Sequence, residues 1–110
     1  METVLVIFDD RNYSSEIMLR LSSEGMNSIG PVSTAGMALA LAAQTRPTVA
    51  IVAGTPTGRR GGVELASKLL SDWGVHSWLV DGQGRETPDI PAGEWAPPPE
   101  QIDRLRRALG

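Results

Sequence analysis

The chain has 110 residues, of which 41% are hydrophobic and 21% charged, and its formal net charge is −3. This length and balance predict one globular domain, residues 1–110, with a single hydrophobic core. An acidic net charge argues against a nucleic-acid partner, which requires a basic face. The absence of cysteine excludes disulfides and thiolate chemistry, and the single histidine, His76, excludes a multi-histidine metal site.

The sequence indicates neither a signal peptide nor a membrane span. Glu2 precedes an apolar run that is too short to act as a signal. No apolar segment approaches the roughly 20 residues that a helix needs to cross a bilayer. We therefore expect a cytoplasmic, soluble protein without a membrane partner.

The first predicted element is a buried strand that ends at two carboxylates. Residues 4–8 are all apolar, and Asp9 and Asp10 follow directly. A run rich in Val and Ile is typical of a strand buried on both faces of a sheet. Because ligands in open α/β sheets bind beyond the carboxyl ends of such strands, Asp9 and Asp10 are the first candidate site.

Helices and strands then alternate along the chain. Apolar residues spaced by four predict a helix over residues 12–24, with Asn12 or Ser14 as its N-cap and Gly25 at its end. Residues 26–32 are predicted as a short edge strand, because they contain a proline, which cannot donate a hydrogen bond to a central strand ladder.

A second helix and a second buried strand follow. Residues 35–45 are rich in alanine and leucine, which are strong helix formers, and Ser33 or Thr34 is expected to cap them. Residues 48–52 form a short apolar run, which predicts another central strand.

The next segment, residues 53–62, is rich in Gly, Thr and Arg and is predicted to be a loop. One hypothesis makes it a phosphate cradle before a helix, but it lacks the Gly-Lys-Ser/Thr ending of a P-loop, so we favour a flexible loop. A third helix is predicted over residues 63–73, with Trp73 on its inward face. A third buried strand, residues 76–80, then ends at Asp81.

Glycine and proline dominate residues 82–99, where we expect at most one helical turn and a short strand around residues 94–96. Pro99 suits the first turn of a last helix, residues 100–109. The inward side chains expected for that helix are Ile102, Leu105 and Leu109. Strands that alternate with helices in this way predict an α/β fold with a parallel sheet and helices on both faces.

This order resembles the receiver domain, the phosphoacceptor module of two-component response regulators. The acidic pair closes the first strand, residues 25–41 match the family's second strand and helix without a gap, and residues 46–52 resemble its Arg-Pro-Asp entry into the third strand. Residues 62–66 resemble the start of the third helix. The resemblance covers about residues 3–82 and implies a flavodoxin-like, receiver-like open parallel sheet whose fourth helix is shortened or missing.

The resemblance also implies that the family's chemistry is lost. In the family, two acidic residues hold a divalent cation, an aspartate ending the third strand accepts the phosphoryl group, and a Ser or Thr and a Lys contact its oxygens. Here the acceptor position falls on Ala53, whose methyl group cannot form an acyl phosphate. Asp81 stands at the Ser/Thr position, the Lys position falls near Trp95 or Ala96, and no lysine follows Lys68.

We therefore expect a degenerate receiver domain, or pseudo-receiver, with no catalytic residue and no cofactor. It would act in two-component or phosphorelay signalling as a phosphorylation-independent interaction module and would not be an enzyme. Its contact surface would include residues 82–99 and the last helix. Its partner would be a signalling protein or a second copy of the chain.

The acidic residues leave other hypotheses open. Asp9 and Asp10, with Asp81 as a third carboxylate, are candidates to bind Mg²⁺ or Ca²⁺, because a cation would relieve the repulsion between them. They would then serve a metal-dependent phosphoryl acceptor or hydrolase. We favour a solvated relic pocket in which Asp9 or Asp10 caps the next helix. A small-ligand binder at the same crevice is a third hypothesis, since flavin and nucleotide binders share this fold.

A basic cluster and a lone histidine have ordinary explanations. Arg104, Arg106 and Arg107 are interpreted as a solvated helix face rather than a phosphate site. His76 has no partner suggested by the sequence and is expected to be structural rather than catalytic.

The three tryptophans, Trp73, Trp78 and Trp95, are predicted to pack in the core. Trp95 stands in the proline-rich segment, so an exposed contact surface is the alternative for that residue.

Overall fold

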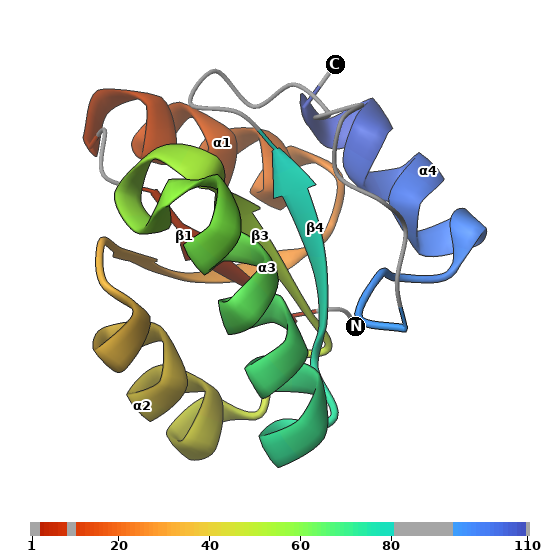
Figure 1. Cartoon of the computed structure of the whole chain (residues 1–110). Helices are drawn as coiled ribbons and strands as arrows, with labels where there is room; N and C mark the ends of the chain where they lie inside the picture. The colour runs from red at the N-terminus through yellow and green to blue at the C-terminus, as the bar shows by residue number, and fades with distance from the viewer. Residues whose placement is uncertain (1–2, 9–10, 81–93, 110) are drawn as a thin grey trace.

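The computed structural model describes residues 3–8, 11–80 and 94–109. Within these residues, strands and helices alternate along the chain, as Figure 1 shows. The strands are β1 (Thr3–Ile7), β2 (Asn27–Val32), β3 (Val49–Ala53) and β4 (His76–Val80). The helices are α1 (Arg11–Ser23), α2 (Ala35–Thr45), α3 (Gly54–Trp73) and α4 (Pro99–Leu109).

The strands form one parallel sheet in the order β2-β1-β3-β4. In the pairing of β1 with β3, Val4 lies opposite Val49 and Ile7 opposite Val52. The chain first moves from β1 to one edge of the sheet and then returns to build the other side, which is the doubly wound, flavodoxin-like order. The predicted fold class is therefore confirmed.

The core has two layers because successive side chains of a buried strand point to opposite faces. Val4 and Val6 of β1 pack toward α1 and α4, whereas Leu5 and Ile7 pack toward α2 and α3. All four are fully buried. The uninterrupted apolar run of β1 is thus explained by a helix layer on each side of the sheet.

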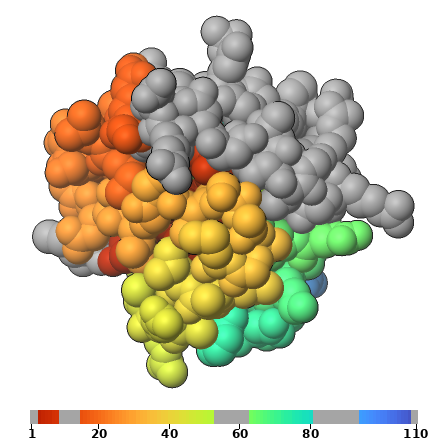
Figure 2. All heavy atoms as spheres, turned by 90° about the vertical axis from the view of Figure 1, so that its left-hand side faces the viewer, coloured from red at the N-terminus to blue at the C-terminus, as the bar shows by residue number. Residues whose placement is uncertain are grey.

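Strand β2 lies at the sheet edge, as predicted from its proline. Leu5 pairs with Ile29 but Ile7 pairs with Val32, so β2 contains one extra residue, a β-bulge. Gly30 has a φ of +111°, and a Cβ atom there would lie 2.7 Å from the carbonyl oxygen of Val6. The close approach to β1 therefore requires glycine. Figure 2 views this side of the molecule and shows the surface of β2 and α2 beside that of α1.

Helix α2 has the predicted bounds. The Thr34 hydroxyl accepts a hydrogen bond from the Met37 N–H at 3.2 Å, so Thr34 rather than Ser33 is the N-cap. The cap expected for the first helix is wrong. Helix α1 begins at Arg11, which places Asn12 and Ser14 inside its first turn rather than before it.

The loop predicted over residues 53–62 is also wrong, because Ala53 ends β3 and α3 begins at Gly54. Pro56 is the third residue of the helix, where the N–H that proline lacks would have no intrahelical acceptor. Glycine costs about 1 kcal/mol in a helix interior. The rest of α3 offsets this cost by burying Leu65 and Leu69 against the sheet.

The last turn of α3 departs from a second expectation. Trp73 is 42% exposed and belongs to neither core cluster, so its predicted inward orientation is wrong. The chain reverses immediately afterwards at Gly74, whose φ is +68°, and the Val75 N–H donates a hydrogen bond to the Leu69 carbonyl. Trp73 is therefore the last residue of α3, directly before the chain turns toward β4.

The carboxyl-terminal part begins with a turn and ends with α4. The strand predicted over residues 94–96 is wrong, since these residues form a turn, although the Trp95 carbonyl accepts a hydrogen bond from the Ser77 N–H at 2.8 Å. Pro99 starts α4 as predicted, and Leu105 and Ala108 bury its inner face against the α1 side. The shortened fourth helix expected after β4 falls on residues 81–93, outside the described residues, as does the Leu109 side chain.

Candidate functional site

The carboxyl ends of β1, β3 and β4 form the edge at which the sequence predicts a site. Ile7 pairs with Val52, and one residue further along, Ala53 pairs with Val80. The carboxyl ends of these three strands therefore lie side by side, and Phe8 follows directly after β1. The strand order also places a topological switch point between β1 and β3, which is where open α/β sheets bind ligands.

The acidic residues predicted for this edge follow the strands in the sequence. Asp9, Asp10 and Asp81 all lie outside the described residues, so their geometry and their binding of a cation stay predictions. Within residues 3–8, 11–80 and 94–109, no group of three or more His, Cys, Asp or Glu side chains is placed to hold a metal ion. The metal hypothesis thus rests on the sequence alone.

The middle strand supplies no carboxylate to this edge. Ala53 is the last residue of β3, and the sequence contains no Asp or Glu between Glu24 and Glu64. Neither the end of β3 nor the first two turns of α3 can therefore provide an acyl-phosphate acceptor, whichever residue there is matched to the receiver family's aspartate. The expected flexible loop at this edge is instead the start of α3.

A second polar feature lies on the outer edge of β4, at Ser77. The residue is fully buried, and its N–H donates to the Trp95 carbonyl, but its hydroxyl has no hydrogen-bond partner among the described residues. The sequence analysis did not single out Ser77. Its only signal is a serine in a strand predicted to be central, where a buried hydroxyl normally needs a partner. That prediction of a central strand is wrong for the described residues, in whose sheet β4 lies at an edge.

The tryptophans have three different environments. Trp78 is buried in the cluster beneath α1 and α4, which confirms its predicted packing role. Trp95 is half-buried and packs against the cluster beneath α2 and α3, so it combines core contact with an accessible side. Trp73 is exposed.

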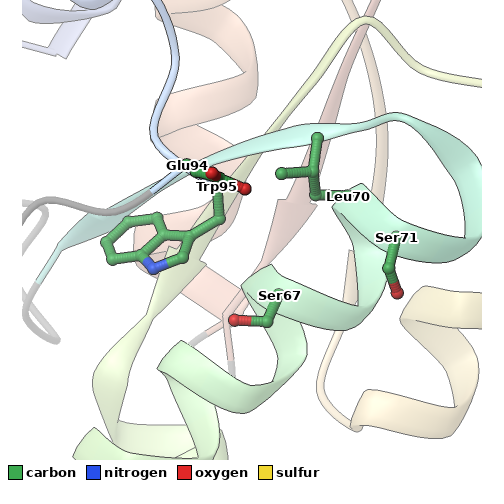
Figure 3. Close-up of a pocket in the computed structure, with 5 residues that line it drawn as sticks. All are labelled: Ser67, Leu70, Ser71, Glu94 and Trp95. Atoms are coloured by element: carbon green, nitrogen blue, oxygen red, sulfur yellow. The ribbon is translucent and has the colours of Figure 1, made fainter.

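Trp95 also forms one wall of a pocket of about 290 Å³. Ser67, Leu70 and Ser71 project from α3 on the opposite side, and Glu94 completes the lining (Figure 3). The pocket therefore joins the outer side of α3 to the turn that precedes α4. Nothing in the sequence pattern indicated this combination, because the two segments are distant along the chain.

The single histidine lies at the start of β4 and the basic cluster on α4, and their predicted roles stay predictions. His76 is half-buried at the start of β4, where its backbone pairs with Val49. On α4, Arg106 contacts Asp103 at 3.2 Å, and both side chains are more than half exposed. Arg104 and Arg107 are also exposed, which is typical of a solvated helix face.

No helix in the part of the chain that the structure describes has the length and apolar character required to cross a bilayer.

A scan against protein-family models finds no match, and neither does a search of curated proteins. Among solved structures, the chain is similar to the signal receiver domain of a modulated diguanylate cyclase from Desulfovibrio desulfuricans G20, described as an example of alternate folding. The TM-score is 0.67 with 22% sequence identity, and the match covers 98% of this chain and 75% of the other. The similarity shows that the two proteins share the receiver-like fold.

Proposed function

We propose that this chain is a degenerate receiver domain that acts in two-component or phosphorelay signalling as a phosphorylation-independent interaction module. The observation that carries the proposal is a receiver-like fold in which the sequence offers no carboxylate between Glu24 and Glu64. Ala53 ends the strand at which a receiver would accept its phosphoryl group. Without that acceptor, the domain would signal by presenting a fixed surface.

The proposed surface comprises α4 and the turn before it. These elements lie on the side of β4 where the predicted fifth strand is replaced by a turn, so this side departs most from the receiver pattern. The partner is a signalling protein or a second copy of the chain. We assign the domain no catalytic activity, no cofactor and no membrane or nucleic-acid partner.

The acceptor chemistry is tested by incubating the protein with acetyl phosphate and Mg²⁺ and measuring its intact mass. A receiver domain that accepts phosphoryl groups serves as the positive control. We expect the chain to keep its original mass, because an alanine side chain offers no nucleophilic oxygen. A stable adduct of one phosphoryl group on the wild-type chain would contradict the proposal. An adduct that disappears in Asp10→Asn would instead support the metal-dependent acceptor or hydrolase.

Cation binding is tested separately by titrating Mg²⁺ or Mn²⁺ while following tryptophan fluorescence. We expect no saturable change in the wild-type chain, in keeping with a solvated relic pocket. A saturable change that is lost in Asp10→Asn would assign a metal site to the acidic residues, and Asp103→Asn, on the exposed face of α4, is the matched control.

A further inference from the structure

The pocket between α3 and the turn before α4 is anchored on its tryptophan side. The Trp95 carbonyl is held at 2.8 Å by the N–H of Ser77, a fully buried residue of β4. The Trp95 side chain packs against the core cluster beneath α2 and α3. The first contact holds the Trp95 backbone to β4, and the second places its side chain against a core cluster to which α3 contributes, so the aromatic wall of the pocket is anchored at both.

The carboxylate and hydroxyl groups that line this pocket can accept hydrogen bonds, and the only charged group among the described lining residues is negative. Of the five described residues that line it, Glu94 carries a carboxylate, two carry hydroxyls, one carries an indole, and none is basic. The Ser71 hydroxyl lies 3.5 Å from the Lys68 carbonyl oxygen and 3.4 Å from an Asp72 carboxylate oxygen. Its single hydrogen can be donated to either of these acceptors, which leaves its own lone pairs for an incoming donor.

The charge around the pocket favours a cation. Asp72 places a second carboxylate beside Ser71, while the nearest basic residue in the sequence, Lys68, is not among the lining residues. The face of an indole attracts a positively charged group, and tryptophan is the strongest of the aromatic side chains in this respect. A ligand that is both cationic and rich in hydrogen-bond donors therefore matches the carboxylate, the two hydroxyls and the indole of the lining, and Leu70 can contact its apolar stem.

The size of the pocket selects among cationic ligands. Small-molecule sites occupy roughly 300–1,000 Å³, so a pocket of about 290 Å³ fits a single side chain better than a nucleotide. A guanidinium group is planar, stacks on an aromatic face and presents donors in a fork that matches a carboxylate. A lysine ammonium is a compact point charge, so it cannot stack flat on the indole or donate a parallel pair of hydrogen bonds to a carboxylate as a guanidinium does.

We propose that this pocket receives an arginine side chain of a partner protein. The guanidinium stacks on Trp95 and donates hydrogen bonds to Glu94 and to the Ser67 and Ser71 hydroxyl oxygens. The inference rests on the proposed interaction function, and it gives a specific chemistry to the turn before α4, which belongs to the proposed surface, and extends that surface to α3. The pocket is distinct from the domain's own arginine cluster, because the pocket lies on α3 and the turn, whereas the cluster lies on α4.

The test is a titration of the ¹⁵N-labelled full chain with N-acetyl-arginine methylamide, followed at the indole N–H resonances of its three tryptophans. Trp95→Phe identifies the Trp95 resonance. N-acetyl-citrulline methylamide is the matched probe, since it has nearly the shape of the arginine probe without its charge. We expect a saturable shift of the Trp95 resonance with arginine and binding that is roughly five-fold or more weaker with citrulline. The lysine analogue should also bind more weakly than arginine.

Paired variants locate the interaction. Glu94→Gln removes the charge and keeps the shape, so we expect roughly a five-fold loss of arginine affinity with little change for citrulline. Glu100→Gln makes the same change on the exposed start of α4 and should have no effect. Trp95→Leu should abolish saturation, whereas Trp73→Leu should not, and the backbone amide spectrum of each variant reports whether it is folded.

Several results would overturn the assignment. These are equal affinity for arginine and citrulline, tighter binding of lysine, absence of saturation, and an equal loss in Glu94→Gln and Glu100→Gln. A shift of the Trp95 resonance on raising the protein concentration alone would assign the pocket to a second copy of the chain instead. Phosphorylation of the wild-type chain by acetyl phosphate would contradict the proposed function without affecting this titration, so the two proposals fail separately.

Discussion

The framework from β1 to β3 agrees more closely with the sequence pattern than the region from β4 to α4 does. In the framework, most element bounds agree with the sequence pattern, and polar groups are paired, as at the Thr34 cap and between Thr3 and Thr48. Beyond β4, a turn replaces the predicted strand and the Ser77 hydroxyl lacks a partner among the described residues. Among the described residues, the outer side of β4 is paired with this turn, through the Ser77 N–H and the Trp95 carbonyl.

The second region is nevertheless part of the core. Leu105 of α4 is fully buried in the same cluster as Leu21 of α1, on the face of the sheet formed by Val4 and Val6. The contrast is therefore between a shared core and an edge that departs from the sequence pattern, rather than between a folded part and an appendage.

The largest effect is expected from truncating this shared cluster. Leu105→Ala should lower the free energy of unfolding by about 2–5 kcal/mol, the usual range for a buried leucine, and Leu21→Ala should do the same. Urea unfolding followed by circular dichroism measures both. Leu19, which is 71% exposed on α1, provides the control, with an expected change within about 0.5 kcal/mol for Leu19→Ala. A separate unfolding transition in Leu105→Ala would show that α4 is an appendage after all.

The next largest effect is expected at Gly30, where β2 approaches β1 closely. Gly30→Ala should cost about 2 kcal/mol or more, because the new Cβ meets the Val6 carbonyl oxygen and the positive φ is unfavourable for alanine. Gly36→Ala is the matched control. Its Cβ would meet nothing within 4 Å in the first turn of α2, and it should stabilise the chain by roughly 0.5–1 kcal/mol. Equal melting temperatures for the two variants would rule out the close approach of β2 to β1.

At the edge of β4, a substitution should have the opposite sign. Ser77→Ala removes a buried hydroxyl that has no hydrogen-bond partner among the described residues, so we expect it to raise the free energy of unfolding by up to about 1 kcal/mol. Thermal unfolding monitored by calorimetry measures the change. Ser28→Ala makes the same replacement in half-buried β2 and should not stabilise the chain. A clear loss of stability in Ser77→Ala would mean that the hydroxyl is hydrogen-bonded.

The smallest effect is expected where the framework pairs its polar groups at the surface. The Thr48 hydroxyl accepts from the Thr3 N–H and donates to the Thr3 carbonyl, each at 3.0 Å. Thr48→Val should therefore cost about 0.5–1 kcal/mol, whereas Thr48→Ser keeps the hydroxyl and should stay closer to the wild-type value. Chemical denaturation of the three proteins checks this order. A loss of stability in Thr48→Val as large as that in Gly30→Ala would show that the hydrogen bonds between Thr48 and Thr3 contribute more than an exposed pair should.

The sequence by itself determined the parallel α/β fold, the central strands β1 and β3 and the bounds of α2, because apolar periodicity and capping residues are local signals. It also determined that neither β3 nor the first two turns of α3 contain a carboxylate, which decides the chemistry proposed for that edge. Tertiary structure decided where the local rules fail. Packing of Leu65 and Leu69 continues α3 through a glycine-rich stretch, and reversal at Gly74 leaves Trp73 outside the core.

Only the tertiary structure brought Glu94 and Trp95 to the outer side of α3 and left Ser77 buried beside them. Contacts between segments far apart in the sequence leave no periodic signal along the chain, so a pattern of single residues cannot reveal the pocket that they form. The acidic pair Asp9 and Asp10 was visible at once because its two members are adjacent. The pocket on α3 became visible only when the chain was folded.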